Sequence, residues 1–155
     1  MLDSSHPRLQ RQSSKALANL GVNGGNKAKI CRAGGVPSLI RLAGSENASI
    51  AVEAVAALAN LAVNDESEIV IVREGGLTPL LAGAKDSSSI ELQLQCARAL
   101  RNLSVNPSNK RCILDMGGME VLMSLARSNS QGVRRHAAKA IANLDSDSEM
   151  RIRRK

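Results

Sequence analysis

The chain has 155 residues, of which 43% are hydrophobic, and it contains no phenylalanine, tyrosine or tryptophan. This length suffices for one domain with a sizeable core, and a core of leucine, isoleucine, valine, alanine and methionine favours closely packed helices. The formal net charge of +7 favours acidic partners, whereas the lack of aromatic residues excludes a stacking platform for single-stranded nucleic acid.

The predicted elements begin with a helix that ends in the motif A-L-A-N-L at residues 16–20. A short helix over residues 26–32 follows and stops at the pair Gly34-Gly35, because glycine readily adopts the left-handed conformation that ends a helix. The next helix starts at once with Pro37 in its first turn, where the missing N–H of proline costs nothing. A longer helix, from about residue 49 to residue 63, carries the A-L-A-N-L motif again.

The motif and the glycine pairs recur with a fixed period. The asparagine of the motif recurs as Asn19, Asn60, Asn102 and Asn143, at intervals of 41, 42 and 41 residues. The glycine pairs begin 15 residues after the preceding asparagine, at Gly34, Gly75 and Gly117. Asparagine inside a helix costs roughly half a kcal/mol relative to alanine, so its recurrence indicates a role. No strand-like alternation appears, and we therefore expect an all-α fold.

A period just over 40 residues is typical of helical solenoids. The unit resembles that of the armadillo-repeat family, N-K-x-x-I-x-x-x-GG-[IV]-x-x-L-[IV]-x-L-L followed by a third helix ending A-L-x-N-L. The matching residues are Asn26-Lys27 with Ile30, Gly34, Gly35, Val36, Leu39 and Leu42, and Asn109-Lys110 with Ile113, Gly117, Gly118, Met119, Leu122 and Leu125. The resemblance covers nearly the whole chain and implies an all-α, right-handed armadillo-repeat superhelical solenoid with three helices per repeat.

We predict a single armadillo-repeat domain over residues 1–155, with about three full repeats and a partial repeat at each end. The partial repeats cover residues 1–22 and 146–155, and the full repeats cover about 23–63, 64–105 and 106–145. Residues 148–155 resemble a new first helix cut short, and neither end resembles a polar capping repeat. We therefore expect a fragment of a longer solenoid that associates end to end.

The third helix of each unit carries two stripes, counted from its asparagine as position 0. Positions −10, −6, −3, −2 and +1 cluster as a core stripe, and positions 0, −4, −7 and −11 form a second stripe about 110° away. Third helices line the concave groove in the armadillo family, so the resemblance places the four asparagines on the groove floor. There each carboxamide can pair with the backbone of an extended peptide. The alternative, compatible with the first, is that each amide bonds a neighbouring helix.

The other groove positions should set specificity. Position −4 holds Lys15, Ala56, Arg98 and Lys139. Position −7 holds Gln12, Glu53, Gln95 and His136. Import-receptor members of the family carry a tryptophan at position −4 that stacks on lysine stems, and this chain has none. The groove is therefore more similar to the catenin type, which takes extended acidic peptides, although these charges could instead be solvated on an open face. The candidate peptide-binding side chains, besides Asn19, Asn60, Asn102 and Asn143, are Lys15, Arg98, Lys139, Glu53, Gln95 and His136.

The cysteines and the N-terminal segment bear on the compartment. Cys31, Cys96 and Cys112 are an odd number without C-x-x-C spacing, which disfavours a disulfide framework or a zinc site and fits a reducing compartment. No apolar run approaches the roughly 18 residues of a membrane span, and residues 1–6 lack the features of a signal peptide. We expect a cytoplasmic location, with the nucleus as the alternative.

The sequence offers little for catalysis. No glycine pair has the G-x-x-x-x-G-K-[ST] spacing of a phosphate loop, and His6 and His136 have no partner at metal-ligand or triad spacing. We predict a non-catalytic scaffold without cofactor, metal or small-molecule substrate, which binds an extended, acidic peptide segment of a partner protein. The alternatives left open are a nuclear import adaptor for basic signals and a non-specific nucleic-acid binder.

Overall fold

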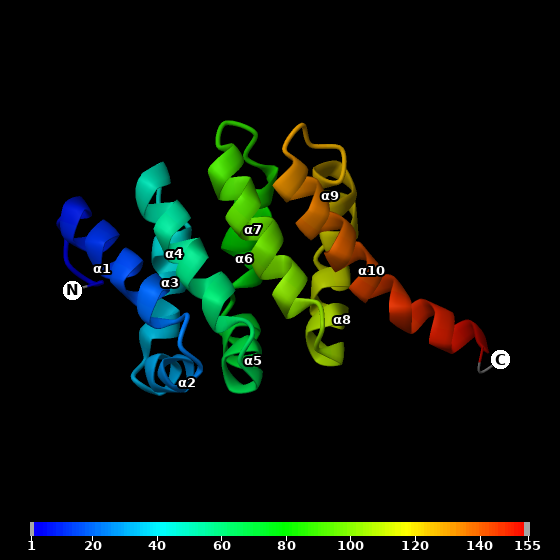
Figure 1. Cartoon of the computed structure of the whole chain (residues 1–155), viewed down its shortest axis with the longest axis horizontal. Helices are drawn as coiled ribbons and strands as arrows, with labels where there is room; N and C mark the ends of the chain where they lie inside the picture. The colour runs from blue at the N-terminus through cyan, green and yellow to red at the C-terminus, as the bar shows by residue number, and fades with distance from the viewer. Residues whose placement is uncertain (1, 154–155) are drawn as a thin grey trace.

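The computed structural model describes the backbone of residues 2–153 and the side chains of residues 2–146. All regular secondary structure in these residues is helical. The helices are α1 (Pro7–Leu20), α2 (Gly24–Arg32), α3 (Gly35–Ala43), α4 (Ala48–Leu61), α5 (Asp65–Arg73), α6 (Leu77–Lys85), α7 (Ile90–Leu103), α8 (Pro107–Asp115), α9 (Gly118–Leu125) and α10 (Gln131–Arg153). Figure 1 shows that they follow one another in a single direction from the N terminus to the C terminus.

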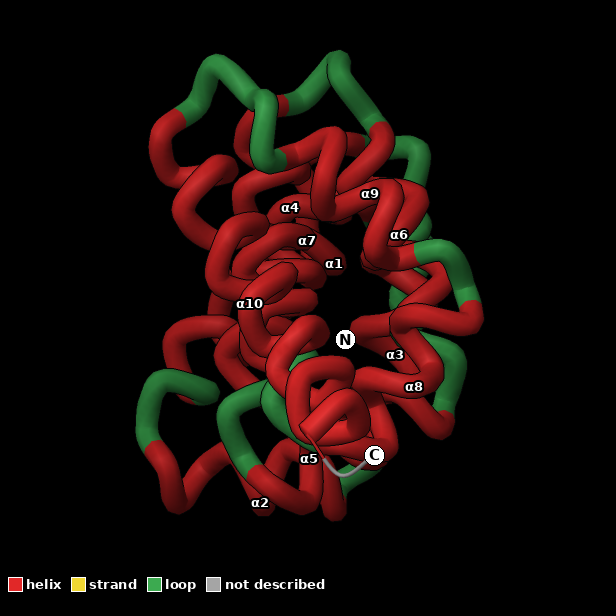
Figure 2. The backbone as a smooth tube through the Cα atoms, turned by 90° about the vertical axis from the view of Figure 1, so that its right-hand side faces the viewer, coloured by secondary structure: helices red, strands yellow, loops and turns green. Residues whose placement is uncertain are grey.

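Three helices form each repeat, namely α2 to α4, α5 to α7 and α8 to α10, and α1 is the third helix of a preceding unit. The third helices lie side by side, and the most extensive contacts between elements join α1 to α4, α4 to α7, and α7 to α10. In a view along the solenoid, these helices form one layer, and α3, α6 and α9 form another (Figure 2). The predicted all-α solenoid with three helices per repeat is confirmed.

Asparagine caps the first helix of each repeat. The side chains of Asn23, Asn64 and Asn106 accept hydrogen bonds from backbone N–H groups in the first turns of α2, α5 and α8. Such a cap is typically worth about 1 kcal/mol, because it satisfies a donor without an intrahelical partner. Each of these asparagines follows an exposed valine, so a Val-Asn pair separates the third helix of one unit from the first helix of the next.

The C-terminal segment differs from the new first helix expected over residues 148–155. The backbone of α10 stays helical from Gln131 through Arg153, so no turn separates the two segments within the described residues. The physical reason is local: after Leu144 the chain lacks the Val-Asn pair that ends the earlier third helices and caps the following ones. The side chains of residues 147–155 lie outside the described part of the structure.

The glycine pairs end the first helices as predicted, but the two glycines of a pair are required for different reasons. Gly75 has a φ of 88°, in the left-handed region, and its N–H donates to the carbonyl oxygen of Val72 at 3.1 Å. Gly76 has a φ of −64°, and its N–H donates to the carbonyl oxygen of Ile71 at 2.8 Å, which completes a Schellman motif. A Cβ atom at Gly76 would lie 2.6 Å from that same oxygen.

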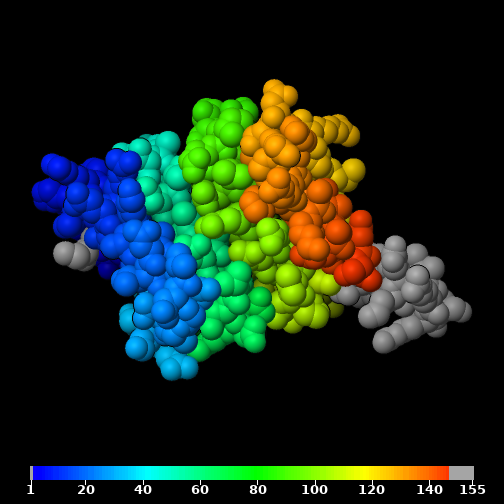
Figure 3. Space-filling model, viewed as in Figure 1, coloured from blue at the N-terminus to red at the C-terminus, as the bar shows by residue number. Residues whose placement is uncertain are grey.

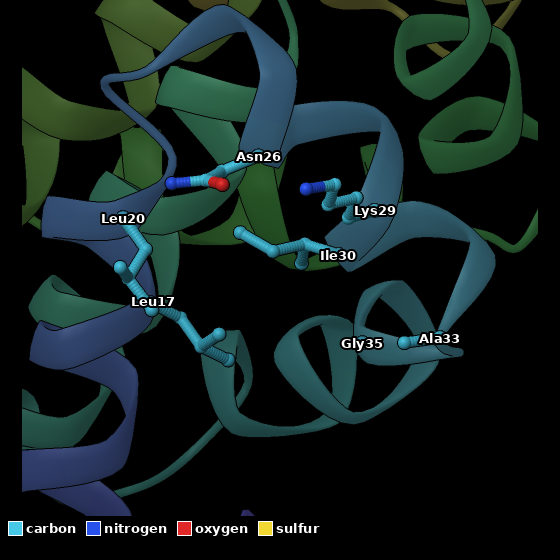
Figure 4. Close-up of a pocket in the computed structure, with 7 residues that line it drawn as sticks. All are labelled: Leu17, Leu20, Asn26, Lys29, Ile30, Ala33 and Gly35. Atoms are coloured by element: carbon cyan, nitrogen blue, oxygen red, sulfur yellow. The ribbon is translucent and has the colours of Figure 1, made fainter.

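The core is aliphatic, and its most buried positions are those predicted for the third helix. In α4 the five core positions are at most 2% exposed: Ile50, Ala54, Ala57, Leu58 and Leu61. Helix α1 is less covered, because the described residues include no first or second helix of its own unit. Its Leu17 and Leu20 face Ile30 across an apolar hollow of about 300 Å³ (Figure 4). End-to-end association through such surfaces stays a prediction.

Candidate peptide-binding groove

The candidate groove is the face of the third-helix layer turned toward the viewer in Figure 1. In the space-filling view of this side, the four third helices follow one another from blue to orange across the molecule (Figure 3). The groove asparagines of α4, α7 and α10 lie in equivalent places, because each contacts the preceding third helix in the same register.

Each of these three asparagines bridges two repeats through its side-chain amide. The Nδ2 atom of Asn60 donates to the carbonyl oxygen of Ala18 at 2.7 Å, and that of Asn102 donates to Ala59 at 2.9 Å. Asn143 donates to the carbonyl oxygen of Arg101 at 3.3 Å and to the Ser104 hydroxyl at 3.1 Å. Bonding to a neighbouring helix, the alternative left open for the four amides, is therefore confirmed for Asn60, Asn102 and Asn143. In α1, Asn19 is exposed and makes no such bond within the described residues.

The Oδ1 atoms of these three amides differ in whether they accept a hydrogen bond. Asn60 Oδ1 accepts a hydrogen bond from Arg98 Nη2 at 2.9 Å. No side chain among residues 2–146 donates to Oδ1 of Asn102 or Asn143, and both residues are half-buried. These two oxygens can accept hydrogen bonds from the N–H groups of a bound peptide.

The Asn102→Ala substitution should lower the free energy of unfolding by about 1 kcal/mol, because it removes the hydrogen bond to Ala59 and the net worth of such a bond is about 0.5–1.5 kcal/mol. Asn19→Ala is the matched control, since Asn19 occupies the same motif position without a described partner. Helix propensity predicts that this control is unchanged or slightly more stable. Urea denaturation of both variants measures the difference, and equal stabilities would contradict the bridging role.

The three predicted cations lie in different environments. Lys15 and Lys139 are exposed, whereas Arg98 is half-buried between α4 and α7. Arg98 Nη2 donates to the carbonyl oxygen of Ala56 at 3.1 Å as well as to Asn60. Burial, followed by the charge of Arg101, lowers the pKa of the Arg98 guanidinium. Arg98 therefore differs from the exposed groove cation that the sequence predicts.

His136 lies within a cluster of arginines. Arg101 Nη1 lies 3.2 Å from His136 Nδ1, which makes Nδ1 the acceptor of that contact. Burial, followed by the charges of Arg101, Arg98 and Arg135, lowers the pKa of His136 below its ordinary value. The imidazole is therefore neutral at neutral pH, and the three guanidinium groups supply the charge.

Arg101 is the residue that the sequence prediction missed. Its signal was present in the motif, because the third copy reads A-L-R-N-L where the other copies have alanine before the asparagine. The described salt bridges join Arg32 to Glu66, Arg41 to Asp3 and Arg73 to Glu74, all outside the third helices. The groove arginines Arg98, Arg101 and Arg135 thus have no carboxylate partner among residues 2–146.

The remaining predicted residues, Glu53 and Gln95, lie on α4 and α7. Glu53 is half-buried on α4, and Gln95 Nε2 donates to Glu91 Oε1 at 3.2 Å. A second basic region lies on α1, where a hollow of about 360 Å³ is lined by Arg8, Arg11, Gln12 and Lys15. The third-helix face therefore carries cations on α1, α7 and α10, and its half-buried Glu53 lies on α4 between them.

The described residues contain no cluster of three or more histidine, cysteine or acidic side chains suited to a metal ion. The three cysteines are free, and burial raises the pKa of the Cys96 thiol to about 12. Within the same part of the chain, no helix combines the length and the apolar character that crossing a bilayer requires.

The armadillo/beta-catenin-like repeat family matches this chain over residues 25–63, 64–105 and 106–144. A curated relative, vacuolar protein 8 of Candida albicans, is 39% identical over 56 residues, which is 36% of this chain and 10% of that protein. The match thus covers only about a tenth of the length of this relative.

Solved structures share the whole architecture. An engineered protein superposes with a TM-score of 0.90 at 36% identity, over 94% of this chain and 60% of that one. A designed armadillo repeat protein in complex with the peptide (KR)4 superposes with a TM-score of 0.86 at 25% identity, over 92% of this chain and 61% of that one. A structure of computationally designed armadillo repeat proteins for modular peptide recognition superposes with a TM-score of 0.87 at 28% identity, over 92% of this chain and 60% of that one. This chain belongs to the armadillo/beta-catenin-like repeat family.

Proposed function

We propose that this chain is a scaffold whose third-helix face binds an extended peptide segment of a partner protein, with a preference for acidic peptides. Armadillo repeats are in general non-catalytic, and two of the structural neighbours are designed for, or bound to, peptides. The observation that carries the acidic preference is the group of arginines around His136, which has no carboxylate partner among residues 2–146.

The backbone of the peptide would be held by the asparagines. Stacked helices lie about 8–10 Å apart, and an extended chain advances about 3.3 Å per residue, so successive asparagines meet it every two to three residues. Because Asn102 Oδ1 and Asn143 Oδ1 have no donor among the described side chains, each can accept a peptide N–H. Such contacts hold an extended backbone whatever its side chains are.

The peptide side chains would be selected by charge. Arg101 directly precedes Asn102 on α7, and Lys139 lies about one turn before Asn143 on α10, with Arg135 one turn further back on the same helix. A carboxylate on this part of the face can therefore gain more than one cation. Each exposed ion pair is worth only about 0.2–1 kcal/mol, so the preference depends on several pairs acting together. It should weaken as salt screens them.

A direct test compares the peptides (Asp-Glu)4 and (Lys-Arg)4 by fluorescence polarisation at low and at physiological salt. We expect tighter binding of the acidic peptide and a roughly fivefold loss of its affinity in the double variant Arg135→Ala/Lys139→Ala at low salt. The control is Lys85→Ala/Arg111→Ala, which removes the same charge from exposed positions outside the third helices. Its effect should be small, because it acts only through the net charge.

Three outcomes would contradict the proposal in different ways. Tighter binding of (Lys-Arg)4, the peptide chemistry bound by the designed neighbour, would overturn the acidic preference and favour an import adaptor for basic signals. Equal losses in the two double variants would show that only net charge acts. Binding of neither peptide would overturn peptide recognition by this face.

A further inference from the structure

Arg98 lies across the groove face of the repeat that precedes its own. It belongs to α7, yet its Nη2 atom donates to two acceptors on α4: the carbonyl oxygen of Ala56 at 3.1 Å and Oδ1 of Asn60 at 2.9 Å. These acceptors are one helical turn apart on the stripe of α4 that a bound peptide would cross. The guanidinium group therefore covers the part of the groove that α4 contributes.

The sequence of α4 allows this placement. Ala56 occupies position −4, where the other third helices carry Lys15, Arg98 and Lys139, so only α4 leaves this position open to a side chain from the next repeat. Both polar atoms of the Asn60 amide are then hydrogen-bonded, because Oδ1 accepts from Arg98 and Nδ2 donates to the carbonyl oxygen of Ala18 at 2.7 Å. By contrast, no described side chain donates a hydrogen bond to Oδ1 of Asn102 or Asn143.

We propose that Arg98 is a specificity-determining residue that closes the groove over α4 and confines the bound peptide to α7 and α10. The inference rests on the proposed function and deepens it, since it names where the peptide footprint ends. A peptide that extended over α4 would have to displace two hydrogen bonds of Arg98 to reach Asn60. What the peptide backbone gains there is offset by what the guanidinium group loses.

The test is a length comparison between (Asp-Glu)2 and (Asp-Glu)4, using isothermal titration calorimetry at physiological salt. Four extended residues span about 13 Å and eight span about 26 Å, so only the longer peptide reaches an additional third helix. The measured quantity is the ratio of the two affinities in each variant. If only (Lys-Arg) peptides bind, the same ratio is measured with (Lys-Arg)2 and (Lys-Arg)4.

We expect the affinity ratio in Arg98→Ala to be about two- to tenfold larger than in the wild type, because Asn60 Oδ1 becomes available to the longer peptide. Arg98→Met, which keeps an apolar stem, should behave alike if the alanine variant folds poorly. Arg111→Ala is the matched control, since it removes the same charge from an exposed position on α8, outside the third helices, without freeing Asn60. The double variant Arg98→Ala/Asn60→Ala should return the ratio to the wild-type value.

Several results would overturn the inference. An unchanged affinity ratio in both Arg98 variants would show that Arg98 does not limit how far the peptide extends along the groove. A similar increase in Arg111→Ala, or an increase that persists in the double variant, would assign the effect to charge or to another contact. Failure of all four peptides to bind the wild-type chain would instead overturn the proposed function, and this inference with it.

Discussion

The Gly76→Ala substitution is expected to lower the free energy of unfolding by roughly 3 kcal/mol. The added Cβ would lie 2.6 Å from the carbonyl oxygen of Ile71 and 2.7 Å from its Cγ2 atom, both closer than carbon tolerates. Because one of these atoms belongs to the backbone, no side-chain rotation relieves the contact. The turn between α5 and α6 must then open, which disturbs the packing of the second repeat on both neighbours.

Its matched control is the preceding residue. An alanine Cβ at Gly75 meets no atom within 4 Å, but it must adopt a φ of 88°. The expected loss is about 1–2 kcal/mol, the ordinary penalty of the left-handed conformation for a residue with a Cβ. Urea denaturation of both variants measures the difference. A Gly76→Ala variant as stable as Gly75→Ala would contradict the close approach to Ile71.

The Leu103→Ala substitution is expected to cost about 2–5 kcal/mol. Leu103 is the last leucine of the third motif copy and is fully buried, so its truncation removes apolar surface and leaves a cavity between repeats. Since neighbouring repeats are coupled through such interfaces, we expect the substitution to destabilise the whole solenoid and not only its own repeat. Thermal or urea unfolding followed by circular dichroism reports it.

Leu20→Ala is the control for this prediction, because Leu20 is the last leucine of the first motif copy. It is 51% exposed, since the described residues place no first or second helix of its own unit beside it. The expected cost is below about 1 kcal/mol, given that roughly half of the side chain is already in water. Similar losses at the two positions would show that burial by the neighbouring repeat does not decide the effect.

Much of the fold follows from the sequence alone. The period of 41 or 42 residues, the glycine pairs and the A-L-x-N-L motif predict three helices per repeat, and the structure confirms this order. The core positions of α4 were also predictable, because helical periodicity assigns Leu58 and Leu61 to one face without knowledge of their neighbours. These features are local, because they depend on the residues within one repeat and not on contacts between repeats.

Only the tertiary structure decides what the groove side chains contact. Arg98 and Lys139 share one motif position, yet Arg98 lies over α4 because Ala56 leaves space there, and Lys139 is exposed. The pairing of Arg101 with His136, and the bonds from Asn60 and Asn102 to the preceding helix, likewise join residues 35 to 43 positions apart. Such contacts depend on how stacked helices are spaced and on the size of each neighbour. A single repeat does not contain that information, whereas the stacked repeats do.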